Sequence, residues 1–258
     1  MNKDLIYKYV PFSVNSLKLL IKGELWFGFP KNLNDPYEGE FLVKQYNSIP
    51  RKSLVEFFYE QNPELCKEET VKSKVEKVIY DYSEFHKDVH TTLKVRLREN
   101  YGVASFSYDK NSILMWSHYS DSHKGFCIIF NKTELLESVK YPWAEFYDVV
   151  YKPNLCVSEL ILEKEKIAFN NEKEILYRKL DIWVKENETR MIAIFTPNNF
   201  KRNIKFNKSC VKGIILGENM LDDNRETLQE LIQNDSEYKD VKFHTAIKNL
   251  TKKEMDIK

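Results

Sequence analysis

Short runs of apolar and aromatic residues, bounded by proline, glycine or charged residues, recur along the whole chain. Runs of this length and composition are typical of β-strands. We expect strands at residues 5–10, 24–29, 102–107, 125–130, 145–151, 188–195, 211–217 and 241–249, the last of them at an edge. These strands do not alternate regularly with helices, so the pattern favours an α+β fold with a mostly antiparallel or mixed sheet.

Apolar residues at helical spacing predict helices in other segments. The leucines of residues 13–22 predict a helix that begins at Ser13 or Asn15 and stops at Gly23. Further helices are expected at 112–124, at about 157–180 and at about 225–233.

Residues 51–100 are rich in Lys and Glu and predict two or three amphipathic helices. Their apolar positions at helical spacing are Leu54, Phe57, Phe58, Val71, Val75, Val78, Ile79, Tyr82, Val89, Leu93 and Leu97. We therefore expect a single domain over residues 1–258 with a helical insertion at 51–100.

Composition narrows the classes of function. With 258 residues and 42% hydrophobic content, the chain is large enough to bury a core. Its 40 Lys and Arg balance 39 Asp and Glu, so a general attraction to nucleic acid or to an anionic membrane is not expected, although a local patch is compatible with this balance. The chain has 7 glycines and neither GxGxxG nor a P-loop, so any nucleotide must be held without a glycine-rich phosphate loop.

The sequence carries no sign of a membrane or secretory destination. The N-terminal residues lack the apolar core of a signal peptide, and no run approaches 18 apolar residues. The cysteines Cys66, Cys127, Cys156 and Cys210 are far apart and form no CxxC pair, which favours reduced thiols over a zinc site. We expect a cytoplasmic protein with no membrane partner.

Three segments combine polar groups with a hydrophobic frame. The first is Asn34-Asp35-Pro36-Tyr37-Glu38, which is either a functional loop or simply a turn in which Asx side chains bond nearby backbone NH groups.

The second segment joins Ser107, at the end of a predicted strand, to the helix that follows. On that helix Met115, Trp116 and Tyr119 share one face, which either packs as core or forms the floor of a ligand cleft. His118 and His123 are five residues apart and do not share a face, so we expect no metal site there. The other helical His pair, His86 and His90, is expected on a solvated surface because zinc needs three or four convergent ligands.

The third segment is Trp183 to Arg190. If residues 186–194 are extended, Glu186, Glu188 and Arg190 point to one face. Buried without partners these charges would be costly, so they either face a polar cleft or pair with one another. In a cleft, one carboxylate could stabilise a cationic transition state while the other takes a proton from a nucleophile.

Together the three segments resemble the bacterial domain-of-unknown-function family 2971. The pattern is LxFxxPxxxNDPxE, then FSxxxxSxxMWxHYxxxHxGxC, then WxxExExR. It is matched here by Leu25, Phe27, Pro30, Asn34, Asp35, Pro36, Glu38, Phe106, Ser107, Ser112, Met115, Trp116, His118, Tyr119, His123, Gly125, Cys127, Trp183, Glu186, Glu188 and Arg190. The resemblance spans about residues 5–220 and assigns no activity.

The block GVASFSYDKNSILMWSHY, followed by KGFCIIF, is more distantly similar to the middle of ADP-ribosyltransferases. This similarity implies a split, mostly antiparallel sheet around a cleft for NAD. It also implies roles in that cleft: Lys8 or Tyr9 on the first strand, Ser107 on the next, and Glu188 on a late strand with Glu186 ahead of it. Trp116, His118 and Tyr119 would flank the nicotinamide, whereas Lys8 stands where these enzymes have His or Arg.

The implied reaction cleaves the N-glycosidic bond of NAD. Glu188 would stabilise the oxocarbenium-like transition state, and Glu186 would activate a protein group, a nucleic-acid group or water. Asn34, Asp35 and Arg190 would bind the substrate or shape the rim of the cleft. The helical insertion would be a platform for a partner protein, and NAD consumption would suit a toxin or an antiviral defence effector.

Two other functions fit the same residues. A metal-dependent nuclease would use Asp35, Glu38, Glu186 and Glu188 around a divalent cation. A non-catalytic module would bind a nucleic acid or a protein through the 116–123 helix and the charged insertion.

Overall fold

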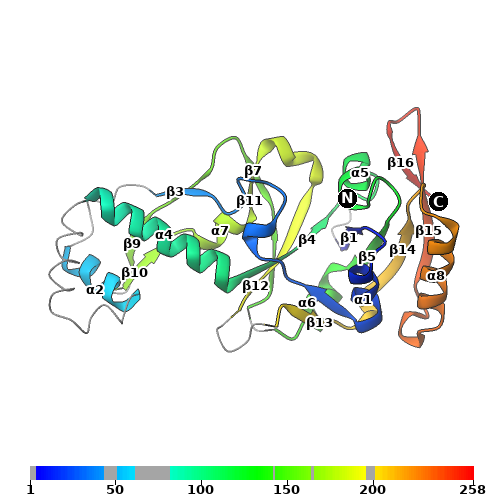
Figure 1. The fold of residues 1–258 in the computed structure, drawn as a ribbon, viewed down its shortest axis with the longest axis horizontal. Helices are drawn as coiled ribbons and strands as arrows, with labels where there is room; N and C mark the ends of the chain where they lie inside the picture. The colour runs from blue at the N-terminus through cyan, green and yellow to red at the C-terminus, as the bar shows by residue number, and fades with distance from the viewer. Residues whose placement is uncertain (1–3, 44–50, 62–81, 142, 164–165, 196–200) are drawn as a thin grey trace.

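An eight-stranded, mostly antiparallel sheet organises the chain and confirms the α+β class (Figure 1). The computed structural model describes residues 4–43, 51–61, 82–141, 143–163, 166–195 and 201–258. The strands, in spatial order, are β16 (Glu254–Ile257), β15 (Lys242–Asn249), β14 (Val211–Leu216), β5 (Phe126–Asn131), β1 (Leu5–Val10), β4 (Tyr101–Ser107), β12 (Glu188–Ile194) and β6 (Glu145–Asp148). Only the β14–β15 pair within this sheet is parallel.

Short two-stranded sheets and helices surround this sheet. The two-stranded sheets are β2 (Glu24–Trp26) with β13 (Asn203–Lys205), β3 (Phe41–Val43) with β8 (Cys156–Ser158), β7 (Val150–Lys152) with β11 (Arg178–Leu180), and β9 (Leu160–Glu163) with β10 (Lys166–Phe169). The α-helices are α1 (Val14–Lys22), α2 (Arg51–Gln61), α4 (Tyr82–Asn100), α5 (Ile113–Tyr119), α6 (Lys132–Ser138), α7 (Glu172–Tyr177) and α8 (Asp222–Gln233). The 3₁₀ segments are η1 (Pro30–Asn32), η3 (Asp181–Glu186), η4 (Lys208–Cys210) and η5 (Ser236–Tyr238).

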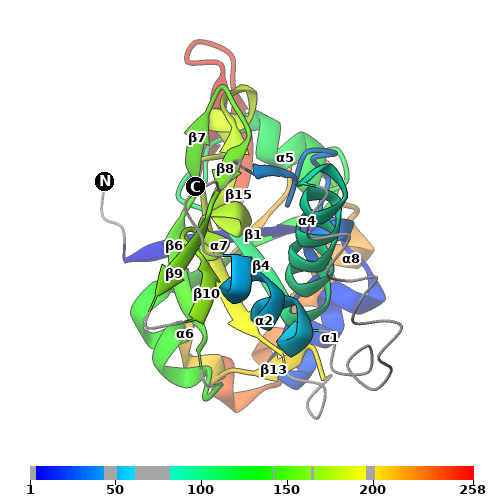
Figure 2. The ribbon, with the colours of Figure 1, turned by 90° about the vertical axis from the view of Figure 1, so that its left-hand side faces the viewer.

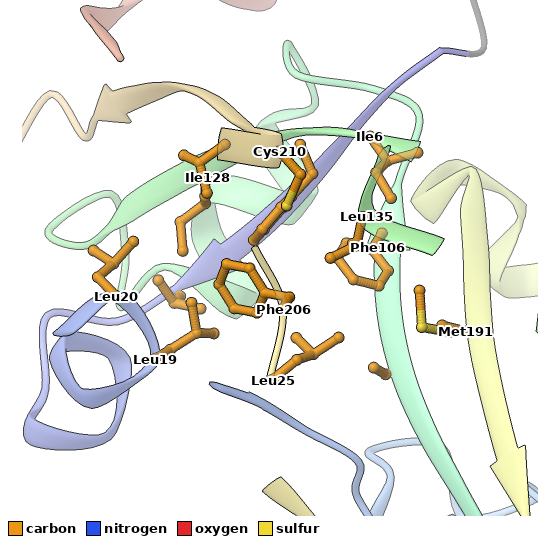
Figure 3. Close-up of a cluster of buried hydrophobic side chains, with 14 of the residues drawn as sticks. Ile6, Leu19, Leu20, Leu25, Phe106, Ile128, Leu135, Met191, Phe206 and Cys210 are labelled. Atoms are coloured by element: carbon orange, nitrogen blue, oxygen red, sulfur yellow. The ribbon is translucent and has the colours of Figure 1, made fainter. Parts of the chain in front are cut away.

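The largest core covers one face of the sheet. Alternate residues of each strand point to this face, including Ile6 of β1, Phe106 of β4 and Met191 of β12 (Figure 3). Leu19 and Leu20 of α1, together with residues of α6 and α8, cover this same face of the sheet and pack against the strand residues. The helix α1 forms because Ser13 caps its first turn and Gly23 ends it in the left-handed conformation, with φ of 58°.

The opposite face carries two smaller cores with a space between them. One lies under α5 and includes Tyr7, Tyr9 and the fully buried Trp116. The other lies under α4 and α7 and includes Val103 and Ile192. The helices α2 and α4, with β9 and β10, extend from this second core at the end of the molecule far from α8 (Figures 1 and 2).

The sheet is weakly joined in its middle. β1 pairs with β5 along its whole length, whereas its pairing with β4 is confined to Tyr7 opposite Ser107. Beyond that point β1 diverges, and Gly28 forms the bridge to Val103 of β4 instead. Among the described residues, β1 and β4 therefore have no ladder of backbone hydrogen bonds beyond Tyr7 and Ser107. Side chains lie between the two strands there instead.

The predicted helix at 157–180 is wrong for most of its length. The structure has the strands β8, β9 and β10 there, then the short helix α7 and the strand β11. The charged, Lys- and Glu-rich composition resembled a solvated helix, but Cys156 and Ser158 pair with Phe41 and Val43 of β3. Pairing with a distant segment overrides local propensity here.

Other differences are smaller. The predicted strand 145–151 is interrupted at Val149, whose backbone NH donates to the carbonyl of Glu188. The predicted helix 112–124 ends at Tyr119, because residues 121–123 have φ between 48° and 67°. The last strand of the sheet is β16, so β15 does not form the edge.

The segment 51–100 contains α2 and α4, with Leu93 and Leu97 buried in the core under α4. The predicted apolar positions Val71, Val75, Val78 and Ile79 lie outside the described residues, as does Cys66. The three described cysteines are free and buried. No helix among the described residues has the length and the apolar character needed to cross a membrane.

Gly125 is required by a close approach of two backbones. A Cβ at this position would overlap the carbonyl oxygen of Val10 and lie 2.9 Å from Cα of Pro11. We expect Gly125→Ala to lower the free energy of unfolding by about 1–3 kcal/mol, the usual cost of overpacking. Gly28→Ala is the matched control, because its nearest neighbour would lie 3.7 Å away. Urea unfolding measures both, and equal losses in the two variants would contradict this interpretation.

Candidate active site

A cavity of about 290 Å³ lies where β1 and β4 diverge, between the two smaller cores. Its walls come from β1, β4, β11 and β12, from α5 and η3, and from the loop that contains η1. This volume is close to the lower end of the range for small-molecule sites, which is about 300–1,000 Å³. We call it the β1–β4 cavity.

Buried ionic groups form one wall of the β1–β4 cavity. The ammonium of Lys179, on β11, lies 2.5 Å from a carboxylate oxygen of Glu186, 3.5 Å from Glu188 and 3.9 Å from Glu38. All four side chains are at least nine-tenths buried. A single lysine therefore holds together three carboxylates from the 31–40 loop, from η3 and from β12.

Arg190 fixes the orientation of Glu188. Its Nε and one terminal nitrogen donate to the two oxygens of Glu188 at 2.8 and 2.9 Å. The other terminal nitrogen donates to Glu38 and, at 2.6 Å, to the carbonyl of Leu176. A planar guanidinium that binds a carboxylate through two parallel bonds fixes both its position and its plane.

These contacts decide the protonation of the carboxylates. Burial alone would raise the pKa of Glu188, but the charges of Arg190 and Lys179 and a hydrogen bond from Ser105 lower that pKa to about 2. Burial raises the pKa of Glu38, and Arg190 only partly opposes this. Glu188 is therefore a permanent anion at neutral pH, while Glu38 is the more readily protonated of the two.

Lys8 occupies the opening between the diverging strands. Its ammonium donates to the carbonyl of Ser105 at 3.1 Å and lies 5.0 Å from the centre of the Phe106 ring. Burial lowers the pKa of Lys8 to about 8, although the charge of Glu188 opposes the shift. This lysine therefore loses its charge near pH 8, well below the pH at which an exposed lysine does.

A chain of hydrogen bonds connects the loop, the helix and the carboxylates. The amide of Asn34 donates to the hydroxyl of Tyr119 at 2.6 Å, and this hydroxyl donates to Glu186 at 2.5 Å. Burial and the bond to Glu186 raise the pKa of Tyr119, so the phenol keeps its proton. The helix α5 presents Tyr119 at its last turn because Ser112 caps its start.

The local backbone brings Glu186 and Glu188 together in an unexpected way. The condition that residues 186–194 are extended is met only from Glu188 onward, because Glu186 ends the 3₁₀ segment η3. Asn187 then has φ of 46° and turns the chain into β12. Asn tolerates this left-handed conformation better than most residues, and it lets both carboxylates reach Lys179.

Seven of the eleven residues that the sequence analysis assigned to the NAD site line the β1–β4 cavity. They are Lys8, Tyr9, Asn34, Tyr119, Glu186, Glu188 and Arg190. They come from segments far apart in the sequence, as the three motifs do.

Four others do not line it. Ser107 is fully buried, and its hydroxyl donates to the backbone carbonyl of Glu186 at 2.7 Å and accepts from the NH of Asp109. Trp116 is also fully buried, packs edge-on against Tyr9 and donates to the carbonyl of Lys110. These two side chains hold the walls in place, which agrees with the interpretation of Trp116 as core.

The remaining two residues, His118 and Asp35, also lie outside the lining of the β1–β4 cavity. His118 is exposed on the far side of α5. Asp35 is buried and accepts from the backbone NH of Tyr37 at 2.9 Å, so this part of the loop is an Asx turn.

Lys179 is the main residue that sequence reasoning missed. It lies in the charged stretch predicted as helix, where nothing distinguishes it from the other lysines. Tyr7 also lines the cavity without having been singled out, whereas Met115 lines it as the ligand-cleft interpretation of its helix face expected. Glu38 was part of the first motif, and its contact with Arg190 is the interaction that brings this loop into the site. Among the described residues, no group of three or more His, Cys, Asp or Glu side chains is arranged to hold a metal ion.

The depressed pKa of Glu188 predicts acid sensitivity. A pKa that falls from 4.5 to about 2 on folding corresponds to about 3 kcal/mol of stability, fully present above pH 4.5 and lost as the pH falls towards 2. We expect Glu188→Gln to destabilise the protein at neutral pH, and the difference from the wild type to shrink steadily as the pH is lowered from 4.5 towards 2. Urea unfolding across this range measures it, and a constant difference would contradict the assignment.

Comparison with known proteins gives one match. Residues 115–191 match the model of a family described as a protein of unknown function, DUF2971. No curated protein and no solved structure matches the chain, so the similarity to ADP-ribosyltransferases stays a prediction. The matched residues include Tyr119, Lys179, Glu186, Glu188 and Arg190, and the resemblance to family 2971 is confirmed over this part of the chain.

Proposed function

We propose that the protein cleaves the N-glycosidic bond of NAD and transfers ADP-ribose to an acceptor or to water. The observation that carries the proposal is the permanently anionic Glu188, held rigidly in a cavity where two antiparallel strands diverge. The proposal also draws on the similarity of the middle block to ADP-ribosyltransferases.

The chemistry needs an anion that does not take up a proton. When the bond between C1′ of the ribose and the nicotinamide nitrogen breaks, its electron pair goes to the nitrogen and a positive charge develops on the ribose. The negative charge of Glu188 would stabilise the positive charge on the ribose. Because two hydrogen bonds from Arg190 already fix this carboxylate, it does not have to move during the reaction. An oxygen of the acceptor then bonds to C1′, and its proton passes to a carboxylate.

Glu186 is the carboxylate proposed for that proton. It lies beside Glu188 on Lys179 and already accepts a hydrogen bond from the Tyr119 hydroxyl. The ring of Tyr119, with Tyr7 and Met115, supplies apolar surface for the nicotinamide.

Lys8 is the group proposed to bind the diphosphate. Its ammonium lies in the opening between β1 and β4, where a charged ligand group can reach it. At about 290 Å³ the cavity suits the nicotinamide and its ribose, with the diphosphate at the opening beside Lys8 and the adenosine outside. NAD consumption of this kind would suit a toxin or an antiviral defence effector.

The occupied carboxylates disfavour the alternative of a metal-dependent nuclease. Each of the carboxylates Glu186, Glu188 and Glu38 that would bind a divalent cation already contacts Lys179 or Arg190. A cation would have to displace these buried charges, which costs several kcal/mol for each ion left unpaired.

The first test is nicotinamide release from NAD by the purified protein. We expect Glu188→Gln to reduce the rate by about 10²–10³, because one preorganised electrostatic contact is lost. Glu172→Gln is the matched control, since it removes a different buried carboxylate, paired with Arg96 outside the cavity. Tyr119→Phe, which keeps the ring, tests the site without breaking an ion pair and should also slow the reaction. Absence of turnover in the wild type, together with no rise in its melting temperature with NAD, would reject the proposal.

The pKa of Lys8 predicts a pH dependence of substrate capture. A protonated Lys8 binds the diphosphate, so kcat/KM should fall as the pH rises above about 8. Lys8→Arg keeps its charge at all accessible pH values and should remove this fall. A profile that is identical in both proteins would show that Lys8 does not bind the substrate.

A further inference from the structure

A groove of about 420 Å³ lies on the side of the sheet opposite the β1–β4 cavity. It is formed by α1, β2 and β13, with β2 pairing with β13 and contacting α1. Leu19, which belongs to the large core, forms part of its base. Because it is separated from the β1–β4 cavity by the sheet, its ligand is independent of the proposed reaction.

An exposed tryptophan dominates this groove. On β2, Leu25 points into the core, so Trp26 points outward with 52% of its surface exposed. Its register partner on β13 is Asn203, whose side chain also points outward and supplies an amide beside the indole. A flat aromatic face next to a polar amide suits a planar ring that can stack and form hydrogen bonds.

The other wall of the groove is positively charged. Lys18 and Lys22 are exposed on α1, one helical turn apart, which places them about 6 Å apart along the axis. Neither forms an ion pair with any described residue. Glu24 is the single acidic residue of the lining, and Lys201 lies 3.7 Å from it. The groove therefore carries a net positive charge although the whole chain is nearly neutral.

We propose that this groove, which we call the Trp26 groove, binds single-stranded nucleic acid, with a base stacked on Trp26 and successive phosphates at Lys18 and Lys22. An aromatic platform combined with a cationic track is the arrangement by which proteins bind single strands without reading their sequence. A neutral sugar would use the tryptophan and Asn203 but not the two lysines. The positive charge of Lys18 and Lys22 thus favours a polyanionic ligand, and the indole of Trp26 favours a polyanion that carries nucleobases.

The test is fluorescence anisotropy with a labelled oligonucleotide of about 12 nucleotides, within the usual range of site sizes. DNA and RNA strands are measured in about 50 mM salt, where phosphate contacts are strong. We expect Trp26→Ala to weaken binding roughly 5- to 150-fold, the effect of losing one stacked base. The double variant Lys18→Gln/Lys22→Gln should reduce the slope of log K against log salt by about 1.4, because two phosphate contacts are lost.

Matched controls come from the same chain. Trp143→Ala removes another exposed tryptophan, and Lys124→Gln/Lys242→Gln removes two other exposed lysines. Both should bind like the wild type, and melting temperatures should be unchanged because every altered side chain is exposed. NAD turnover should also be unchanged in Trp26→Ala, which separates this test from that of the proposed function.

Four results would overturn the proposal. They are no binding by the wild type, equal binding by Trp26→Ala, equal binding of an abasic strand, and equal or tighter binding of a duplex. Binding of a neutral oligosaccharide that depends on Trp26, without binding of the strand, would assign the groove to carbohydrate instead.

Discussion

The ion pairs around Lys179 and Arg190 are the interaction on which the site depends. Where β1 leaves β4, the sheet cannot satisfy its polar groups through backbone pairing, and strand alternation directs Glu188 and Arg190 into the space. Charges buried there are tolerable only if each has a partner. Glu38 and Glu186 complete the pairing, and in doing so they attach the 31–40 loop and η3 to the sheet. The same contacts that stabilise the fold therefore shape the cavity and keep Glu188 anionic.

These ion pairs also give chemically similar residues of the cavity different charge states and different roles. The carboxylates of Glu188 and Glu38 are both bonded to Arg190, yet their pKa values move in opposite directions. At Glu188 the effects of Arg190, Lys179 and Ser105 outweigh burial, whereas at Glu38 burial and the charge of Glu188 outweigh the cations. Lys8 and Lys179 are both cations of the cavity, but only Lys179 is surrounded by carboxylates at ion-pair distance. Lys8 faces the opening instead, with a lowered pKa, and is the cation that a ligand can still use.

Much of the fold followed from local patterns. The strands β1, β4, β5, β12 and β14 are where short apolar runs predicted them, because buried strands need such runs whatever their neighbours. The segment 157–180 failed because its strands are specified by pairing with β3 and with each other, and a charged, Lys- and Glu-rich composition carries no sign of that pairing. A split sheet was an implication of a family resemblance, and the structure instead has one eight-stranded sheet in which β1 and β4 pair only at Tyr7 and Ser107. The residue pattern alone could not locate this weak point.

By itself, the sequence determined that Glu188 and Arg190 share a face, since alternation along a strand requires it. It also determined that Asn34, Tyr119 and Glu186 belong to polar segments framed by core. Only the tertiary structure decided that these groups meet, that Ser107 and Trp116 support the walls rather than line them, and that Lys179 is the central cation. The reason is physical: a side chain's role as ligand, support or partner depends on what packs against it, and those neighbours come from segments up to 152 residues away.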